Sequence, residues 1–83
     1  MVVKVIIDVV LKDEILDPQG DAISRALPRM AFSFKPTTVR QGKSFILTFD
    51  HTPNASEMKE IESAAETLLS NPVIENFSIR VEH

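Results

Sequence analysis

The first eleven residues constrain the fold more than any other segment, because apolar side chains alternate along them. Residues 2–11 are rich in Val and Ile, which favour strands, and every second residue of a strand faces the same side. One of the two sides is wholly apolar. It consists of Val3, Val5, Ile7, Val9 and Leu11. This side is predicted to face the protein core.

The opposite side of the same strand is mixed. Val2, Ile6 and Val10 alternate there with charged residues. A solvated strand face is normally more polar than this. Burying the three apolar side chains would contribute roughly 1.5–3 kcal/mol each. We therefore expect a cover over this face, either another layer of the chain or, in our preferred interpretation, a partner.

A first helix is predicted to begin at Asp17-Pro18, since Asp caps free N–H groups and Pro suits the first helical position. Apolar residues then recur at helical spacing as far as Met30. Pro28 interrupts the pattern because it has no N–H to donate to the Ser24 carbonyl. The helix is expected to kink or end near Pro28.

Two further strands are predicted on either side of Gly42. Residues 37–41 are β-prone, and residues 44–50 alternate, with Phe45, Leu47 and Phe49 on one face. Glycine tolerates the positive φ of tight turns, so the two segments indicate a hairpin around Gln41-Gly42.

The second helix has the clearest start. Asn54 is followed three residues later by Glu57, which resembles a capping box. The helix is predicted to stop at Ser70-Asn71, because a residue before proline avoids the helical region. A last strand is predicted over residues 73–82. Its alternate residues Phe77, Ile79 and Val81 are expected to face inward.

The elements follow the order β-α-β-β-α-β in a single domain, residues 1–83. This order predicts an α+β, ferredoxin-like arrangement: a four-stranded antiparallel sheet with two helices on one face. The other sheet face would then be open, in agreement with the surplus apolar residues on the first strand.

Composition limits the partners and the chemistry. With 9 basic and 12 acidic residues the net charge is −3, which argues against nucleic acid. No stretch approaches the ~18–20 apolar residues of a membrane span, so we expect no membrane contact. The chain has no cysteine, which agrees with an expected cytoplasmic location. A domain of this size buries only about 60% of its unfolded surface, which favours oligomerisation.

The residues of a catalytic centre are missing. The only histidines, His51 in a predicted loop and His83 at the end of the chain, are interpreted as solvated. No phosphate-binding glycine loop, metal cluster or nucleophile–base pair is found, so the isolated chain is not expected to catalyse a reaction.

Three blocks resemble the PurS family, in its order and across nearly the whole chain. Residues 16–27 resemble its LDPQG-x-A-(V/I)-x-x-A-L block, residues 39–43 its V-R-x-G-K turn, and residues 68–75 its L-L-x-N-P-V-I-E block. The family usually has Leu-Gly-(Phe/Tyr) after the first helix, where this chain has Met30-Ala31-Phe32. A left-handed helix end is costlier for Ala than for Gly.

The resemblance implies a function. The PurS family is the non-catalytic small subunit of phosphoribosylformylglycinamidine synthase, an ATP-dependent ligase of purine biosynthesis that takes nitrogen from glutamine. It implies self-association into a dimer or tetramer, and partners that are a large synthetase subunit, PurL, and a glutaminase subunit, PurQ. ATP and Mg²⁺ are expected on the large subunit, and no cofactor on this chain.

The resemblance also suggests contact residues. Gln19, Arg40, Lys43, Asn71 and Glu75 are candidates for contacts with the partner subunits. Arg40 and Lys43 are expected to flank a hairpin tip, where cations could meet an acidic patch. Val2, Ile6 and Val10 become candidates for self-association.

Two other functions are weighed against assembly. A small-molecule-sensing regulatory domain, which would bind its ligand at a dimer interface, would melt at a ligand-dependent temperature. An acylphosphatase-like enzyme would need Gly and Arg in the loop after the first strand, where the chain has Lys12-Asp13-Glu14-Ile15.

Overall fold

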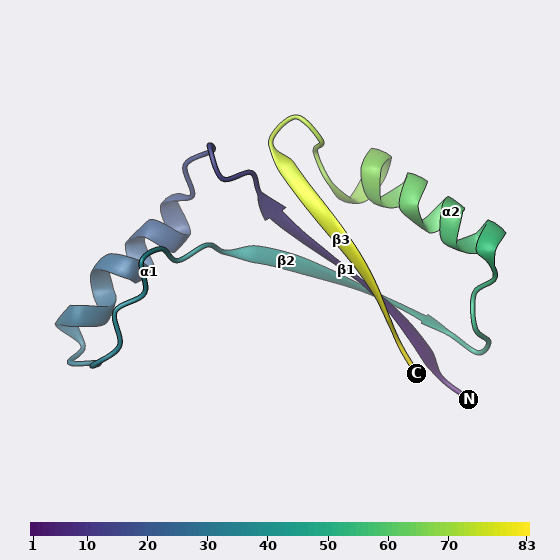
Figure 1. Ribbon diagram of the computed structural model, residues 1–83, viewed down its shortest axis with the longest axis horizontal. Coiled ribbons are helices and arrows are strands. Elements are labelled where there is room, and N and C mark those ends of the chain that lie inside the picture. Colours follow the sequence, from purple (N-terminus) through teal and green to yellow (C-terminus); the bar gives the residue numbers. More distant parts are fainter.

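A computed structural model describes residues 1–83 and shows a sheet, a helix packed on it and a second helix that lies apart (Figure 1). The elements are, in chain order, β1 (Val3–Leu11), α1 (Pro18–Arg29), β2 (Gly42–Phe49), α2 (Ala55–Ala64), a π-helical segment η1 (Ala65–Leu69) and β3 (Glu75–Glu82). The sheet has three antiparallel strands in the order β2-β1-β3. The helices lack the length and the apolar character that a membrane span requires.

The core lies on the wholly apolar face of β1, as the alternation predicts. Val5 pairs with Leu47 and Val81, so that apolar side chains from all three strands share this face. Ile61 and Ala65 of the α2–η1 helix pack against it. The fully buried side chains with the largest volumes are all on β1, which is therefore the centre of the core.

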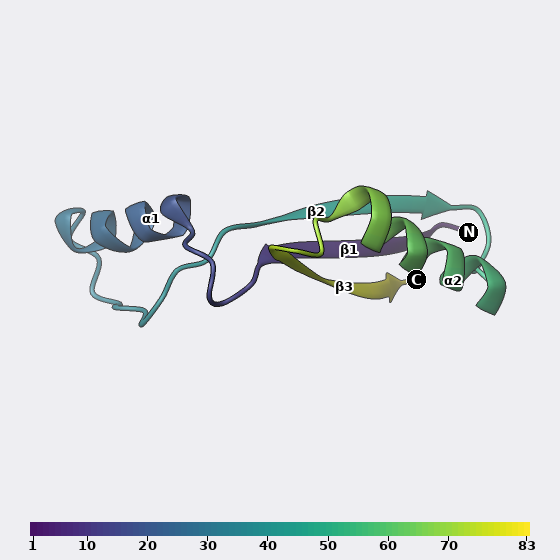
Figure 2. The ribbon, with the colours of Figure 1, turned by 90° about the horizontal axis from the view of Figure 1, so that it is seen from above.

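The prediction of two helices on one face is wrong. Only α2, with its continuation η1, packs on the sheet; α1 lies beyond the end of the sheet in both views (Figures 1 and 2). The radius of gyration is 16.3 Å, against about 12 Å for a compact domain of this length. We call residues 12–41, which contain α1 and the segment that returns from it, the arm.

The four-stranded prediction is also wrong, because residues 37–41 form no strand and no hairpin. The end of this segment contacts the start of α1 instead. The Gln41 N–H donates to Asp17 Oδ2 at 2.6 Å, and the Val39 carbonyl lies against Gly20. Gly42 does not have a positive φ. It opens β2, where a Cβ would lie 2.7 Å from the Val9 carbonyl oxygen.

The predicted helix ends are confirmed. Asp17 caps α1 through the Gly20 N–H, and Asn54 forms a complete capping box with Glu57 at the start of α2. The first helix ends at Arg29, one residue after Pro28, and Ala31 takes a left-handed φ of 64°. Because Ala adopts that conformation at a cost, the departure from Gly at this position stores strain at the helix end.

The last strand begins later than expected. The N–H groups of Ile74 and Glu75 both donate to the Asn71 carbonyl, in a turn that follows the end of η1. The strand therefore starts at Glu75 and not at residue 73. Phe77 and Ile79 face the core as predicted, whereas Val81 remains 38% exposed.

Candidate functional site

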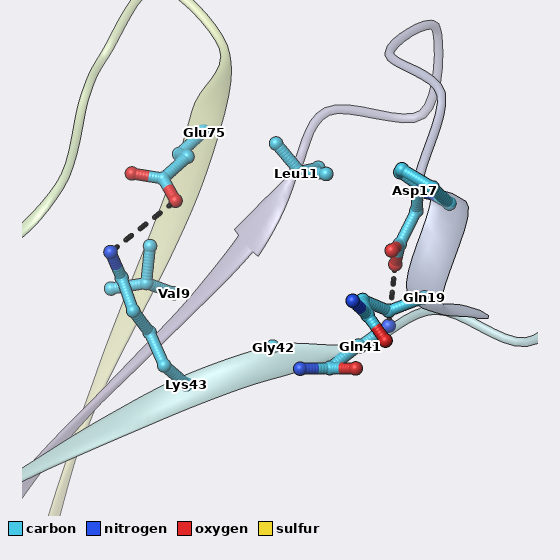
Figure 3. Close-up of a pocket in the computed structure, with 9 residues that line it drawn as sticks. Val9, Leu11, Asp17, Gln19, Gln41, Gly42, Lys43 and Glu75 are labelled. Carbon is cyan, nitrogen blue, oxygen red and sulfur yellow. Dashed lines mark hydrogen bonds and ion pairs between the residues drawn. The ribbon is translucent and has the colours of Figure 1, made fainter.

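A hollow lies where the arm leaves the sheet (Figure 3). We call it the notch; its volume is about 280 Å³. Val9 and Leu11 give it an apolar wall. The remaining wall is mostly polar and includes Asp17, Gln19, Gln41, Lys43 and Glu75. The notch thus joins three parts of the sequence that are far apart along the chain.

Asp17 fixes the arm side of the notch. The residue is 5% exposed, and its carboxylate accepts hydrogen bonds from the Gly20 N–H at 3.1 Å and the Gln41 N–H at 2.6 Å. The bond from Gln41, followed by the bond from Gly20, lowers the pKa of Asp17 below its ordinary value. Asp17 therefore does more than cap α1, because it also ties the start of the helix to the segment that leads into β2.

Arg40 reinforces the same junction. Its guanidinium donates to the Lys12 carbonyl at 2.9 Å and to the Ile15 carbonyl at 2.7 Å. The expectation that Arg40 flanks a hairpin tip is wrong, since residues 37–41 form no hairpin. Arg40 instead crosses the base of the arm and holds the β1–α1 connection against the start of β2.

Lys43 and Glu75 form the sheet side of the notch. Lys43 Nζ lies 3.6 Å from Glu75 Oε2, with the Lys43 side chain half exposed and that of Glu75 15% exposed (Figure 3). The other carboxylate oxygen of Glu75 accepts from the Asn71 N–H at 2.7 Å. An ion pair and a hydrogen bond, both made by the Glu75 carboxylate, therefore connect the turn before β3 to the start of β2.

The structure thus gathers the five predicted contact residues around one feature. Gln19, Lys43 and Glu75 line the notch; Asn71 bonds to Glu75, and Arg40 precedes the lining residue Gln41. Gln41 was missed, although it stands inside the V-R-x-G-K block. The side-chain amides of Gln19 and Gln41 make no hydrogen bond within the chain and remain available to a partner.

The polar groups of the notch are suited to binding. It offers two amides, one ammonium group and two carboxylates, and the carboxylates already accept hydrogen bonds from the backbone. No group of three or more potential metal ligands occurs in the chain. Directional polar contacts with another protein are the chemistry that these groups support.

A second polar cluster stands at the start of α2. The His51 ring contacts the Asp50 carboxylate at 2.8 Å and the Glu57 carboxylate at 3.1 Å. The hydrogen bond to Asp50, followed by the bond to Glu57, raises the pKa of His51. The pKa of Asp50 is lowered chiefly by its bond to His51. The pKa of Glu57 is lowered chiefly by the hydrogen bond from the Asn54 N–H. His51 is exposed as expected, and its contacts brace the capping box.

The residues predicted for self-association lie on the uncovered face of the sheet, which we call the open face. Val2 and Val10 are 59% and 42% exposed. Ile6 is only 6% exposed, because it sits between Ile46 on β2 and Arg80 on β3. No element of this chain covers the three residues, so the alternative of another layer of the chain is wrong, and contact with a partner stays a prediction.

Comparison with known proteins identifies relatives along the whole chain. The PurS family, described as phosphoribosylformylglycinamidine (FGAM) synthase, matches residues 4–83. The phosphoribosylformylglycinamidine synthase subunit PurS of Mycobacterium leprae is 46% identical over 79 residues, which are 95% of each chain. The subunit of Bacillus subtilis is 37% identical over 79 residues, 95% of this chain and 92% of the relative.

Solved structures agree in fold. Bacillus subtilis PurS superposes with a TM-score of 0.76 at 36% identity, covering 98% of this chain and 99% of the other. A chain in the structure of PurLQS from Thermotoga maritima superposes with a TM-score of 0.81 at 30% identity, covering 99% of both chains.

Proposed function

Because this chain belongs to the PurS family of phosphoribosylformylglycinamidine synthase subunits, we propose that it assembles the synthetase subunit PurL with the glutaminase subunit PurQ. It is the small subunit of an ATP-dependent ligase that makes formylglycinamidine ribonucleotide in purine biosynthesis. Its part in the reaction is to hold two other active sites together, so that ammonia released from glutamine reaches the ribonucleotide.

The single observation that carries this proposal is the convergence on the notch. Residues from the three blocks that resemble the family meet there, although they are separated by more than fifty positions in sequence. The side-chain amides of Gln19 and Gln41 have no partner in the chain, and Lys43 is half exposed. A subunit that docks at this end would complete these hydrogen bonds.

The rest of the chemistry belongs to the partners. ATP and Mg²⁺ bind on PurL, and this chain carries no cofactor of its own. We expect the complex to work in the cytoplasm. The proposal that this chain carries no cofactor is supported by the notch, where both carboxylates already accept hydrogen bonds from the backbone.

Self-association is part of the same function. The structure buries only ten residues and leaves large apolar side chains exposed on several parts of the chain, of which two concern self-association. One is the open face, with Val2, Val10 and Ile46. The other is the arm, where Ile23 and Met30 of the α1 region are 44% and 66% exposed. Both surfaces provide apolar area that contact with further subunits would remove from water.

The test is ATP turnover by PurL and PurQ with and without this chain, with glutamine as nitrogen donor and then with an ammonium salt. We expect the chain to restore glutamine-driven turnover and to leave ammonium-driven turnover nearly unchanged. The double variant Gln19→Ala/Gln41→Ala should reduce the glutamine-driven rate, whereas Glu62→Ala on the exposed side of α2 should not. Equal turnover with and without the chain would refute the assembly role.

A further inference from the structure

The connection between η1 and β3 exposes two large apolar side chains. Leu68 and Val73 are 79% and 77% exposed, more than any other large apolar side chain except that of Met1. Leu68 lies near the end of η1, and Val73 lies in the turn before β3, five positions later. We call residues 68–73 the anchor segment. Single exposed apolar residues are common on protein surfaces, whereas these two stand close together in the chain.

Hydrogen bonds fix the conformation of the anchor segment. Asn71 Oδ1 accepts from the Val73 N–H at 3.1 Å. The Asn71 carbonyl accepts from the Ile74 N–H at 3.1 Å and from the Glu75 N–H at 2.7 Å. Asn71 is therefore a positioning residue, because it holds the backbone that carries Val73. A segment that is already ordered loses little conformational freedom when it binds, so its exposed side chains are pre-organised for contact.

Leu68 is carried by an uncommon helix. The Ser70 N–H donates to the carbonyl of Ala65, five positions earlier, at 3.0 Å, which is the bond that defines a π-helix. Single π-helical turns are rare and frequently occur at functional sites. Ala65 is fully buried against the sheet while Leu68 stays in water. The segment η1 therefore keeps its packing contact and still exposes an apolar side chain.

The anchor segment is continuous with the notch. The Asn71 N–H donates to Glu75 Oε1 at 2.7 Å, and Glu75 Oε2 lies 3.6 Å from Lys43 Nζ on the notch wall (Figure 3). The notch provides side-chain amides without a partner, and the anchor segment beside it provides two apolar side chains. Together they have the apolar centre and polar surroundings that are typical of a protein interface.

We propose that Leu68 and Val73 anchor the subunit that docks at the notch. The occupant is a protein surface with an apolar pocket for these two side chains and with hydrogen-bonding groups that face the notch. Neither residue lines the notch itself, so a small molecule bound there would leave both in water. This inference rests on the proposed assembly function and assigns the residues that provide its apolar contact.

The first experiment measures the affinity of the labelled chain for PurL and PurQ together, by fluorescence anisotropy. The double variant Leu68→Ser/Val73→Ser should bind at least about tenfold more weakly than the wild type, because both side chains leave water in the complex. Phe34→Ser is the matched control, since it removes a 57% exposed apolar side chain from the segment that returns from α1. It should bind with the wild-type affinity. Circular dichroism should show the same melting temperature for all three chains, because none of these side chains belongs to the core.

The second experiment identifies the subunit that contacts each surface in the assembled complex. The photo-crosslinking variants Val73→benzoylphenylalanine and Gln19→benzoylphenylalanine are each mixed with PurL and PurQ and irradiated. Both positions should crosslink to the same larger subunit, because one protein covers the anchor segment and the notch.

Three results would overturn the inference. The double variant binds as tightly as the wild type, Phe34→Ser loses as much affinity as the double variant, or position 73 crosslinks to a different subunit from position 19 or only to another copy of this chain. Wild-type binding with an unaffected double variant would refute this inference alone. If the wild type itself did not bind PurL and PurQ, the proposed function would fail with it.

Discussion

Replacing Gly20 with Ala should detach the arm while leaving the sheet intact. A Cβ at this position would overlap the Val39 carbonyl oxygen and lie 2.8 Å from the carbonyl carbon, nearer than the 3.0 Å that Cβ contacts respect. Both obstacles are backbone atoms, so a side-chain rotation cannot relieve them. The Val39 peptide must move away from α1 by roughly an ångström.

That movement breaks the contacts on either side of Val39. A shift of about 1 Å takes the Gln41 N–H, now 2.6 Å from Asp17 Oδ2, beyond hydrogen-bonding range. Arg40 withdraws from the two carbonyls that it binds. At about 1 kcal/mol for each of these exposed bonds, the Arg40 contacts alone represent about 2 kcal/mol. Opening of the arm would then become roughly 30-fold more frequent.

Hydrogen exchange resolved by residue measures this change. Amides of α1 should exchange roughly 30-fold faster in Gly20→Ala, while those of β1 keep their wild-type rates, because α1 lies beyond the sheet (Figure 2). The sign is informative, since in an uncrowded helix Ala is favoured over Gly by up to ~1 kcal/mol and would slow exchange. Slower exchange in α1, or an equal loss of protection in β1, would refute the reasoning.

Gly42→Ala is the matched control, because its Cβ would crowd the Val9 carbonyl and the Val10 side chain inside the sheet. It should have the opposite pattern, with faster exchange in β1 and little change in α1. The two substitutions add the same methyl group, so a common response to both would show that the arm and the sheet open as one unit.

Three further predictions concern the helix ends. Asn54→Ala removes the cap of α2 and should cost about 1 kcal/mol, or roughly 4–8 °C in melting temperature, whereas Asn54→Ser should lose much less. Ala31→Gly should raise the free energy of unfolding by up to ~1 kcal/mol in urea titrations, since Gly accepts a φ of 64° without strain; a decrease would contradict this. The pKa of His51 is raised in the folded state, so its stabilising contribution is complete below pH 6.5 and the melting temperature should fall as the pH rises above that value. The melting temperature should also fall in acid, as Asp50 and Glu57 protonate through pKa values below 3.8 and 4.5. The variant His51→Gln should abolish the fall at high pH.

The parts of the fold that depend on local chemistry could be predicted from the sequence. The cap at Asp17, the capping box at Asn54 and the end of the first helix near Pro28 each depend on residues within four positions of one another. The alternation along residues 2–11 predicted the core face of β1 for the same reason. Such signals do not require the location of any distant segment.

The predictions that were wrong concern segments whose structure depends on residues far away in the sequence. Residues 37–41 have strand-forming side chains, but an available carboxylate at Asp17, 24 positions before Gln41, binds the backbone that a neighbouring strand would need. The element order β-α-β-β-α-β then gives the wrong place for α1 as well. Neither the amphipathic pattern of α1 nor its caps indicate whether the surface it covers belongs to the same chain.

The candidate site shows the same division. Its residues could be selected because they carry polar groups beyond those needed for caps and turns, and the structure brings them to one place. Gln41 was missed because its side chain has no local function, and Arg40 was misplaced because its two acceptors, the Lys12 and Ile15 carbonyls, are backbone atoms without a sequence signature. A polar side chain can be identified from the sequence, whereas the backbone group that it binds cannot.

The incomplete core and the assembly role have a common physical cause. One helix on a three-stranded sheet leaves the open face and the apolar side of α1 in water, although covering each would be favourable. A chain that placed α1 on its own sheet would gain stability and lose both surfaces. By holding α1 away through Asp17 and Arg40, this chain keeps apolar area available for other subunits, and the hydrogen bonds at the notch fix the direction in which that area is presented.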